Sequence, residues 1–231
     1  SAAALKQIAK SGKKILFVAT KKQAKQVVAD LAQTVNMPYV VERWPGGMLT
    51  NFPTIRKAVK KMSTIDKMVK DGTFDTLSKR ERLQVTRQRA KLEKNLGSIQ
   101  DLTRLPSAIF VVDVMKENIA VKEANRLGIP VFGIVDTNSD PSDIDFIIPA
   151  NDDASKSIEL ILGSLCESIK EGLEERKVEK ADSAAAEEQE GEDTPRRERK
   201  GKAGAKKTVV AKEDQDAINA AVADKFAKEE E

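Results

Sequence analysis

The sequence lacks histidine altogether and contains a single cysteine among its 231 residues. Without histidine there is no Ser-His-Asp triad, no Cys-His nucleophile and no imidazole ligand for a metal ion. One cysteine excludes an internal disulfide framework. No apolar run reaches the roughly 18 residues of a membrane-spanning helix, and no secretory signal opens the chain. We therefore expect a reduced, soluble, intracellular protein without a membrane span.

Aromatic residues are also scarce, at 4%, whereas charged residues make up 33% of the chain. The net charge of +3 conceals a strong segregation of sign. Residues 1–100 carry 21 Lys and Arg against 7 Asp and Glu, while residues 101–178 carry 8 against 15. A basic block of this size favours a polyanionic partner, nucleic acid or an anionic membrane surface, over a basic face balanced by an acidic one.

Short apolar runs alternate with helical patterns along most of the chain. Buried strands are predicted near residues 15–19, 38–41, 108–112, 130–135 and 146–148, and helices over residues 1–10, 21–34, 117–127 and 154–177. This alternation predicts right-handed crossovers and a parallel α/β fold with a Rossmann-like (flavodoxin-like) sheet. We assign residues 1–52 and 101–177 to this α/β domain.

Residues 53–100 have a different sequence pattern, in which apolar residues recur at helical spacing. This pattern predicts an inserted antiparallel coiled-coil helical hairpin. One helix covers residues 52–69, Asp71-Gly72 breaks it, and Ser78-x-x-Glu81 is a capping box that starts another. The segment carries 13 Lys and Arg against 5 Asp and Glu. The apolar positions expected for its second helix are Leu83, Ala90, Leu92, Leu96 and Ile99.

Residues 178–231 are poor in large apolar side chains and rich in charge, so we predict a disordered charged tail. Near the strand ends, Asp136 and Asp140 fit Asx turns better than a metal site. Cys166 fits a small buried residue, and Trp44 fits a packing role better than base stacking. We predict no catalytic residues, no cofactor and no metal ligands.

Candidate phosphate-binding residues follow from the distribution of lysine and arginine. Some of them flank predicted strand ends and others decorate the hairpin, where arginine can grip a phosphate bidentately. A solvated coiled-coil exterior would mix the two signs more evenly. The predicted RNA-binding residues are Lys21, Lys22, Lys25, Arg43, Arg56, Lys57, Lys60, Lys61, Arg87 and Arg89.

Five motifs, in order, carry a resemblance to a known family. They are ILFVATKKQA (15–24), RWPGGMLTNF (43–52), LEKNLGSIQDLTRLPSAIFVVDV (92–114), IAVKEANRLGIPVFGIVDTNSDP (119–141) and IIPANDDASKSIEL (147–160). Over residues 5–175 the chain closely resembles the bacterial-type small-subunit ribosomal protein two family. The resemblance implies a parallel α/β domain with a protruding helical hairpin, in agreement with the pattern above.

The resemblance also implies a function. It implies binding to small-subunit ribosomal RNA near the head–body junction, contacts with neighbouring small-subunit proteins including protein one, a part in messenger RNA recruitment, and a place on the cytoplasmic ribosome. The family's usual first segment, with its histidine-containing motif, has no counterpart here, so we expect the sequence to be part of a longer protein. The charged C-terminal extension receives no role from the resemblance.

Three hypotheses stay open on the sequence alone. The main one is a structural RNA-binding protein of the small ribosomal subunit without catalysis. The second is a nucleotide- or sugar-phosphate-binding α/β enzyme, although neither G-x-G-x-x-G nor G-x-x-x-x-G-K-[ST] occurs. The third is a protein–protein adaptor that uses the helical hairpin as its docking arm.

Overall fold

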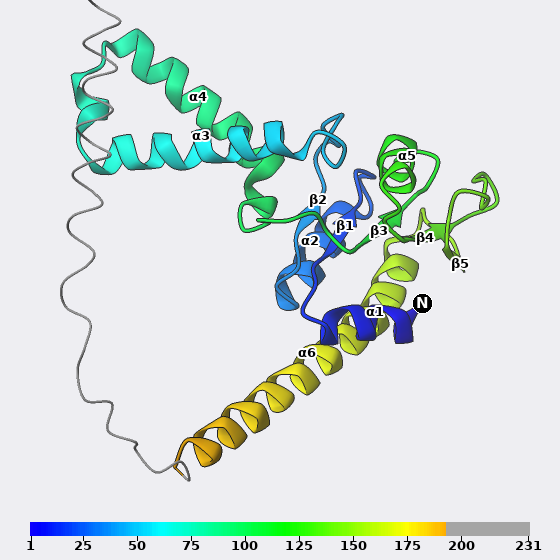
Figure 1. Ribbon diagram of the computed structural model, residues 1–231. Helices are drawn as coiled ribbons and strands as arrows, with labels where there is room; N and C mark the ends of the chain where they lie inside the picture. Colours follow the sequence, from blue (N-terminus) through cyan, green and yellow to red (C-terminus); the bar gives the residue numbers. More distant parts are fainter. Residues whose placement is uncertain (193–231) are drawn as a thin grey trace, which may run out of the picture. The chain divides into compact units, whose positions relative to one another are not determined.

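Five short strands form one parallel sheet in the order β2-β1-β3-β4-β5 (Figure 1). This computed structural model describes residues 1–192, with side chains described as far as residue 181. The strand order is that of flavodoxin-like doubly wound sheets, so the predicted α/β class and parallel sheet are confirmed. The strands are β1 (Ile15–Val18), β2 (Tyr39–Val40), β3 (Ala108–Val112), β4 (Val131–Val135) and β5 (Phe146–Pro149).

The central strands are buried on both faces, which explains their continuous apolar runs. In β1, Phe17 belongs to one core cluster and its neighbours Leu16 and Val18 belong to the other. Phe17 pairs in register with Phe110 of β3, and their ring centroids lie 5.6 Å apart. Alternation along the central strands therefore supplies apolar side chains to two separate layers.

Helices cover both faces of this sheet (Figure 1). Residues from α1, α2 and α6 build one core cluster, and residues from α5 join the loop around Trp44 in the other. Gly128, with φ of 66°, follows the C-cap residue Leu127 of α5. None of the described helices is long and apolar enough to cross a bilayer. These helices are α1 (Ala2–Lys10), α2 (Lys25–Thr34), α5 (Asn118–Arg126) and α6 (Ser155–Glu192).

Two further helices, α3 (Phe52–Lys70) and α4 (Lys79–Leu96), lie between β2 and β3 in the chain. Gly72, with φ of 73°, makes the turn after α3, and Ser78 and Glu81 form the predicted capping box of α4. The predicted apolar face of α4 is partly wrong, because Leu83 is 50% exposed. Half-buried or buried positions instead follow a spacing of three and four residues, at Val85, Arg89, Leu92 and Leu96. We call α3 and α4 the helix pair.

Helix α6 continues to Glu192, well past the helix end that we predicted at residue 177. Residues 178–192 are mostly Ala, Glu and Lys, which are strong helix formers that need no apolar partner to favour a helix. The scarcity of large apolar residues there predicts disorder, because a packed core cannot form. The remainder of the predicted tail, residues 193–231, lies outside the described residues.

The packing of α1 on α6 depends on a residue without a side chain. A Cβ atom added at Gly172 would lie 2.5 Å from the backbone carbonyl oxygen of Lys6, whereas one added at Gly163 in the same helix would meet nothing within 4 Å. Gly163→Ala should therefore stabilise the chain by about 0.5–1 kcal/mol through helix propensity. Gly172→Ala should lower the free energy of unfolding by about 1–3 kcal/mol, because α1 must shift to relieve the overlap.

Denaturant unfolding of the full chain measures both variants. Equal stabilisation by the two alanine substitutions would contradict the close approach of α1 to α6. The comparison separates packing from helix propensity, because both glycines sit in the interior of one helix and gain the same intrinsic benefit from a methyl group.

Candidate nucleic-acid interface

Six of the ten predicted phosphate-binding residues have exposed side chains that form no ion pair or hydrogen bond within the described part of the chain. Their cationic groups remain available to a ligand. Phosphate oxygens are the natural partners of such groups, since exposed lysine and arginine displace the counterions of a polyanion. We call them the open cations: Lys22, Arg43, Lys57, Lys60, Lys61 and Arg87.

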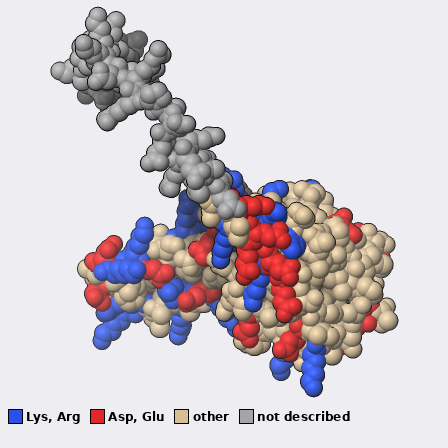
Figure 2. Space-filling view, turned by 90° about the horizontal axis from the view of Figure 1, so that it is seen from below, with Lys and Arg blue, Asp and Glu red and all other residues tan. Residues whose placement is uncertain are grey.

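The open cations of the helix pair face away from its apolar side. On α3, Lys57, Lys60 and Lys61 are exposed, while Val59 and Met62 are buried. With 3.6 residues per turn, these lysines lie on the opposite side of the helix from the apolar residues. Figure 2 shows lysine and arginine side chains projecting from the helix pair on the left of the molecule.

Lys67, Lys70, Lys79, Arg80 and Lys91 are also exposed on the helix pair. The helix pair thus presents a cationic exterior that is broader than the residues predicted for it. It suits a polyanion better than a compact ligand, because its charges are spread along two helices.

The other four predicted residues are engaged within the chain. Arg56 donates to the carbonyl oxygens of Gln100, at 3.4 Å, and of Leu102, at 3.0 Å, and so ties α3 to the segment after α4. Lys25 lies 3.4 Å from Glu42. Lys94 and Lys25 both face that carboxylate, and their hydrogen bonds lower the pKa of Glu42 against the opposing effect of burial.

Arg89 bridges the two helices of the pair. Its Nε lies 2.5 Å from Asp66 Oδ1 on α3, and its Nη1 lies 2.6 Å from Glu93 Oε2 one turn further along α4. The bond to Asp66, followed by the nearby charges, raises the pKa of the Arg89 guanidinium. The Arg89 guanidinium therefore engages two carboxylates and joins the two helices of the pair.

Lys21 is the most enclosed of the predicted residues, with a side chain only 13% exposed. Its Nζ lies 2.7 Å from Asp152, 2.6 Å from Asp153 and 3.2 Å from Asp113. Burial lowers the pKa of Lys21, but the hydrogen bonds that its ammonium donates to these three carboxylates outweigh burial and raise the pKa overall. The ammonium therefore balances acidic groups at the carboxyl ends of the strands instead of facing outward.

The same edge of the sheet gathers three carboxylates whose oxygens lie within 4.8 Å of one another, from Asp136, Asp152 and Asp153. Carboxylate oxygens are donors that a hard cation accepts. Asp136 was weighed in the sequence as part of a metal site with other acids, but its grouping with Asp152 and Asp153 joins two separate loops and leaves no local spacing to detect. Asp140 forms the predicted Asx turn by accepting from the Ser142 amide at 2.9 Å.

A buried carboxylate holds the loop that carries Arg43. Glu123 of α5 is 8% exposed and accepts from the Trp44 indole at 3.1 Å and from the Gly47 amide at 2.7 Å. Its second oxygen accepts from the amides of Leu49, at 3.0 Å, and Thr50, at 3.1 Å. The prediction that Trp44 serves packing is confirmed, because the side chain is only 7% exposed.

Sequence reasoning missed Glu123, because nothing marks one acid on an amphipathic helix as the partner of a loop 73 to 79 positions earlier. Burial raises the pKa of the Glu123 carboxyl, but the hydrogen bonds from Thr50, Trp44, Gly47 and Leu49 outweigh burial and lower it overall. The carboxylate is therefore charged at neutral pH, and it fixes the turn in which Gly47 has φ of 80°.

Comparison with known proteins adds the decisive observation. A family model described as Ribosomal protein S2 matches residues 1–172. The chain is 73% identical over its whole length to the Small ribosomal subunit protein uS2 of Parabacteroides distasonis, of which it covers 81%. It is 71% identical over its whole length to the protein of that name from Bacteroides thetaiotaomicron, again with 81% covered.

The chain belongs to the ribosomal protein S2 family. A third relative, the Small ribosomal subunit protein uS2 of Porphyromonas gingivalis, is 76% identical over 180 residues, which are 78% of this chain and 64% of that protein. The predicted family is thereby confirmed. Members of the ribosomal protein S2 family are structural proteins of the ribosome and not enzymes, so the nucleotide-enzyme hypothesis is set aside.

Proposed function

We propose that this chain is a structural constituent of the small ribosomal subunit that binds small-subunit ribosomal RNA mainly through the open cations of the helix pair. The observation that carries this proposal is the cationic exterior of α3 and α4, where Lys57, Lys60, Lys61 and Arg87 have no acidic partner among the described residues. Phosphates supply the missing negative charge. Folded RNA would be recognised by its shape and backbone.

We further propose that the helix pair is a coiled-coil hairpin that forms a separate inserted unit over residues 53–100. Its support is the three- and four-residue spacing of the enclosed positions on α4 and the Arg89–Asp66 bridge between the two helices. A rigid pair of helices holds its lysines at fixed distances. It is therefore better suited to following an RNA backbone than a flexible basic segment would be.

The family resemblance supports the remaining assignments. We propose a location on the cytoplasmic ribosome, near the head–body junction of the small subunit and beside neighbouring small-subunit proteins. Protein one is proposed among those neighbours, with a part in messenger RNA recruitment. Lys22 and Arg43 join the proposed RNA contacts. Lys21, Lys25, Arg56 and Arg89 act mainly through their contacts within the chain.

The first test removes three open cations from α3. Lys57→Gln, Lys60→Gln and Lys61→Gln, combined in the full chain, should flatten the salt dependence of ribosomal RNA binding by about 2.1–2.7 logarithmic units, because each lost phosphate contact removes about 0.7–0.9. Binding is measured by filter retention with small-subunit ribosomal RNA transcribed from the Parabacteroides distasonis sequence, between about 50 and 200 mM salt.

Two controls make this experiment specific. Glutamine keeps a long polar side chain with good helix propensity, so circular dichroism should report unchanged helix content. A double replacement of exposed cations on α5, Lys122→Gln with Arg126→Gln, measures the general effect of lost positive charge. If the α3 variant keeps the parent salt slope, the helix pair is not the main RNA contact.

A further inference from the structure

A second cationic surface lies away from the helix pair, in a groove beside α6. The groove is a surface hollow of about 540 Å³ between α6 and the segments that end α2 and precede β1. Val35 and Leu173 supply apolar lining, and Thr34 and Asn36 supply polar groups. Its other lining residues are charged: Lys14, Lys170, Glu174, Arg176, Lys177 and Lys180. We call it the α6 groove.

Positive charge dominates the α6 groove. Among the described residues, no ion pair engages Lys14, Lys170, Arg176 or Lys177, although the chain forms many ion pairs elsewhere. Lys14 is fixed by a 2.6 Å hydrogen bond to the carbonyl oxygen of Asn36, which leaves two of its three ammonium hydrogens for a ligand. Four cationic groups therefore meet around one hollow with Glu174 as its single acidic lining residue.

Arg176 is held in place by a glycine. Gly12 has φ of 73°, and a Cβ atom added there would lie 2.0 Å from the central carbon of the Arg176 guanidinium. The guanidinium thus occupies the space that a side chain at position 12 would fill. Arg176 is half-buried and its direction is set by backbone contact, so it enters a complex already ordered and loses little conformational freedom.

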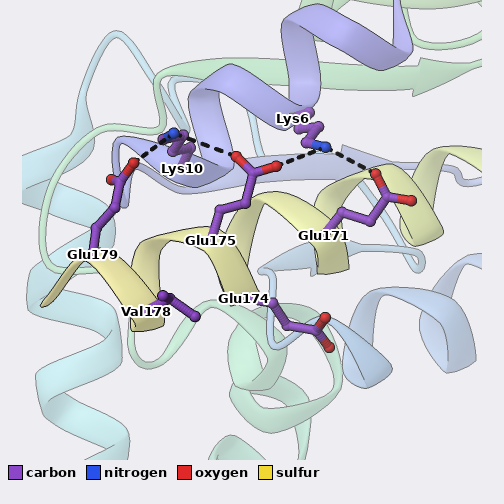
Figure 3. Close-up of a pocket in the computed structure, with 7 residues that line it drawn as sticks. All are labelled: Lys6, Lys10, Glu171, Glu174, Glu175, Val178 and Glu179. Carbon is purple, nitrogen blue, oxygen red and sulfur yellow. Dashed lines mark hydrogen bonds and ion pairs between the residues drawn. The ribbon is translucent and has the colours of Figure 1, made fainter. Parts of the chain in front are cut away.

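The opposite flank of α6 has the contrary charge. Figure 3 shows Lys6 and Lys10 of α1 bridging to Glu171, Glu175 and Glu179. Lys6 contacts Glu171 at 3.0 Å and Glu175 at 2.9 Å, and Lys10 contacts Glu179 at 2.6 Å. Because these lysines are committed to glutamates, this flank is acidic and repels phosphate, so a polyanion near α6 is directed to the groove side.

We propose that the α6 groove is a second RNA-binding site, which grips the phosphodiester backbone of ribosomal RNA through Lys14, Lys170, Arg176 and Lys177. The inference rests on the proposed function and deepens it, because it adds a contact on the α/β part of the chain to the contact made by the helix pair. An apolar floor with a cationic rim fits a sugar–phosphate backbone, whose sugars contact the floor while its phosphates meet the rim.

The test replaces two exposed lysines that no described contact engages. Lys170→Gln with Lys177→Gln, in the full chain, should flatten the salt slope of binding to the same ribosomal RNA by about 1.4–1.8 logarithmic units. The Lys122→Gln and Arg126→Gln variant, with the same change in net charge on the other face of the sheet, should leave the slope within about 0.5 units of the parent. Combining the groove and α3 substitutions should sum their effects, since distant sites act independently.

Each outcome separates the two proposals. If the salt slope of RNA binding is flatter in the α3 variant but unchanged in the groove variant, the groove inference is wrong and the proposed function stands. If the parent chain fails to bind the ribosomal RNA at all, both are wrong. Flotation with phosphatidylglycerol vesicles is the remaining arm: a groove variant that loses vesicle binding but keeps its RNA salt slope would assign the groove to a membrane surface and overturn the inference.

Discussion

Replacing Lys21 by methionine should lower the free energy of unfolding by about 3–5 kcal/mol at neutral pH, the cost of breaking a buried ion pair on one side. Its ammonium lies 2.7 Å from Asp152, which is fully buried and whose Oδ2 has no hydrogen-bond partner. Asp113, 3.2 Å away, is also buried. Without Lys21, two buried carboxylates would lose their cationic partner. Urea unfolding of the full chain measures the loss.

Lys22 provides the matched control for this prediction. It is exposed and forms no ion pair among the described residues, so Lys22→Met should change stability by less than about 0.5 kcal/mol. RNA binding should show the reverse order: Lys22→Met should flatten the salt slope by about 0.7–0.9 units, and Lys21→Met should leave it unchanged. Equal stability losses in the two variants would refute the internal role of Lys21.

The pH dependence of Lys21→Met gives an independent check. Because the folded pKa of Lys21 is raised, its ion pairs stabilise the parent chain fully below the unfolded lysine pKa of about 10.4, and that stability is lost only as pH rises through the folded pKa. At neutral pH the ion pairs of Lys21 therefore contribute their full stabilisation to the parent chain. Between neutral pH and about pH 10 the difference in the free energy of unfolding between parent and variant should therefore stay constant, and urea unfolding across that range checks it.

Lys21 also shows what charge counting along a sequence cannot reveal. The excess of basic residues in the first hundred positions includes the 13 Lys and Arg of residues 53–100, most of which are exposed. It could not separate open from engaged cations, because the partner of Lys21 is Asp152, 131 positions later. Arg89 and Asp66 meet across two helices in the same way. Such pairing depends on the folded arrangement and leaves no local signal.

The fold was more readily predicted, because its determinants are local. Runs such as Ile15–Val18 are apolar at every position, and each is bounded by polar residues, which marks a strand buried on both faces. The outward position of Leu83 was missed because α4 has few apolar residues to define its face. There the half-buried side includes Arg89, whose charge is balanced by Asp66 and Glu93.

Glu123→Ala should lower the free energy of unfolding by about 3–5 kcal/mol. It leaves the buried indole N–H of Trp44 and the buried amide of Leu49 without acceptors, at about 1–3 kcal/mol each. The hydrogen bonds from the amides of Gly47 and Thr50 are lost as well. Trp44 is the only tryptophan in the chain, so its fluorescence reports directly on this loop. We expect a red-shifted emission in the variant, measured beside its urea unfolding curve.

The carboxylate's charge can be tested separately from its shape. Glu123→Gln keeps one accepting oxygen but turns a donating amide toward the other N–H groups. Its free energy of unfolding should therefore lie between those of the parent and Glu123→Ala. Because the folded pKa of Glu123 is lowered, the parent's extra stability is present above the unfolded pKa of about 4.3 and is lost as pH falls through the folded pKa. The difference in the free energy of unfolding between parent and Glu123→Gln should therefore disappear in acid. A gap that persists unchanged below that pKa would mean that the loop depends on packing against α5 and not on the charge of Glu123.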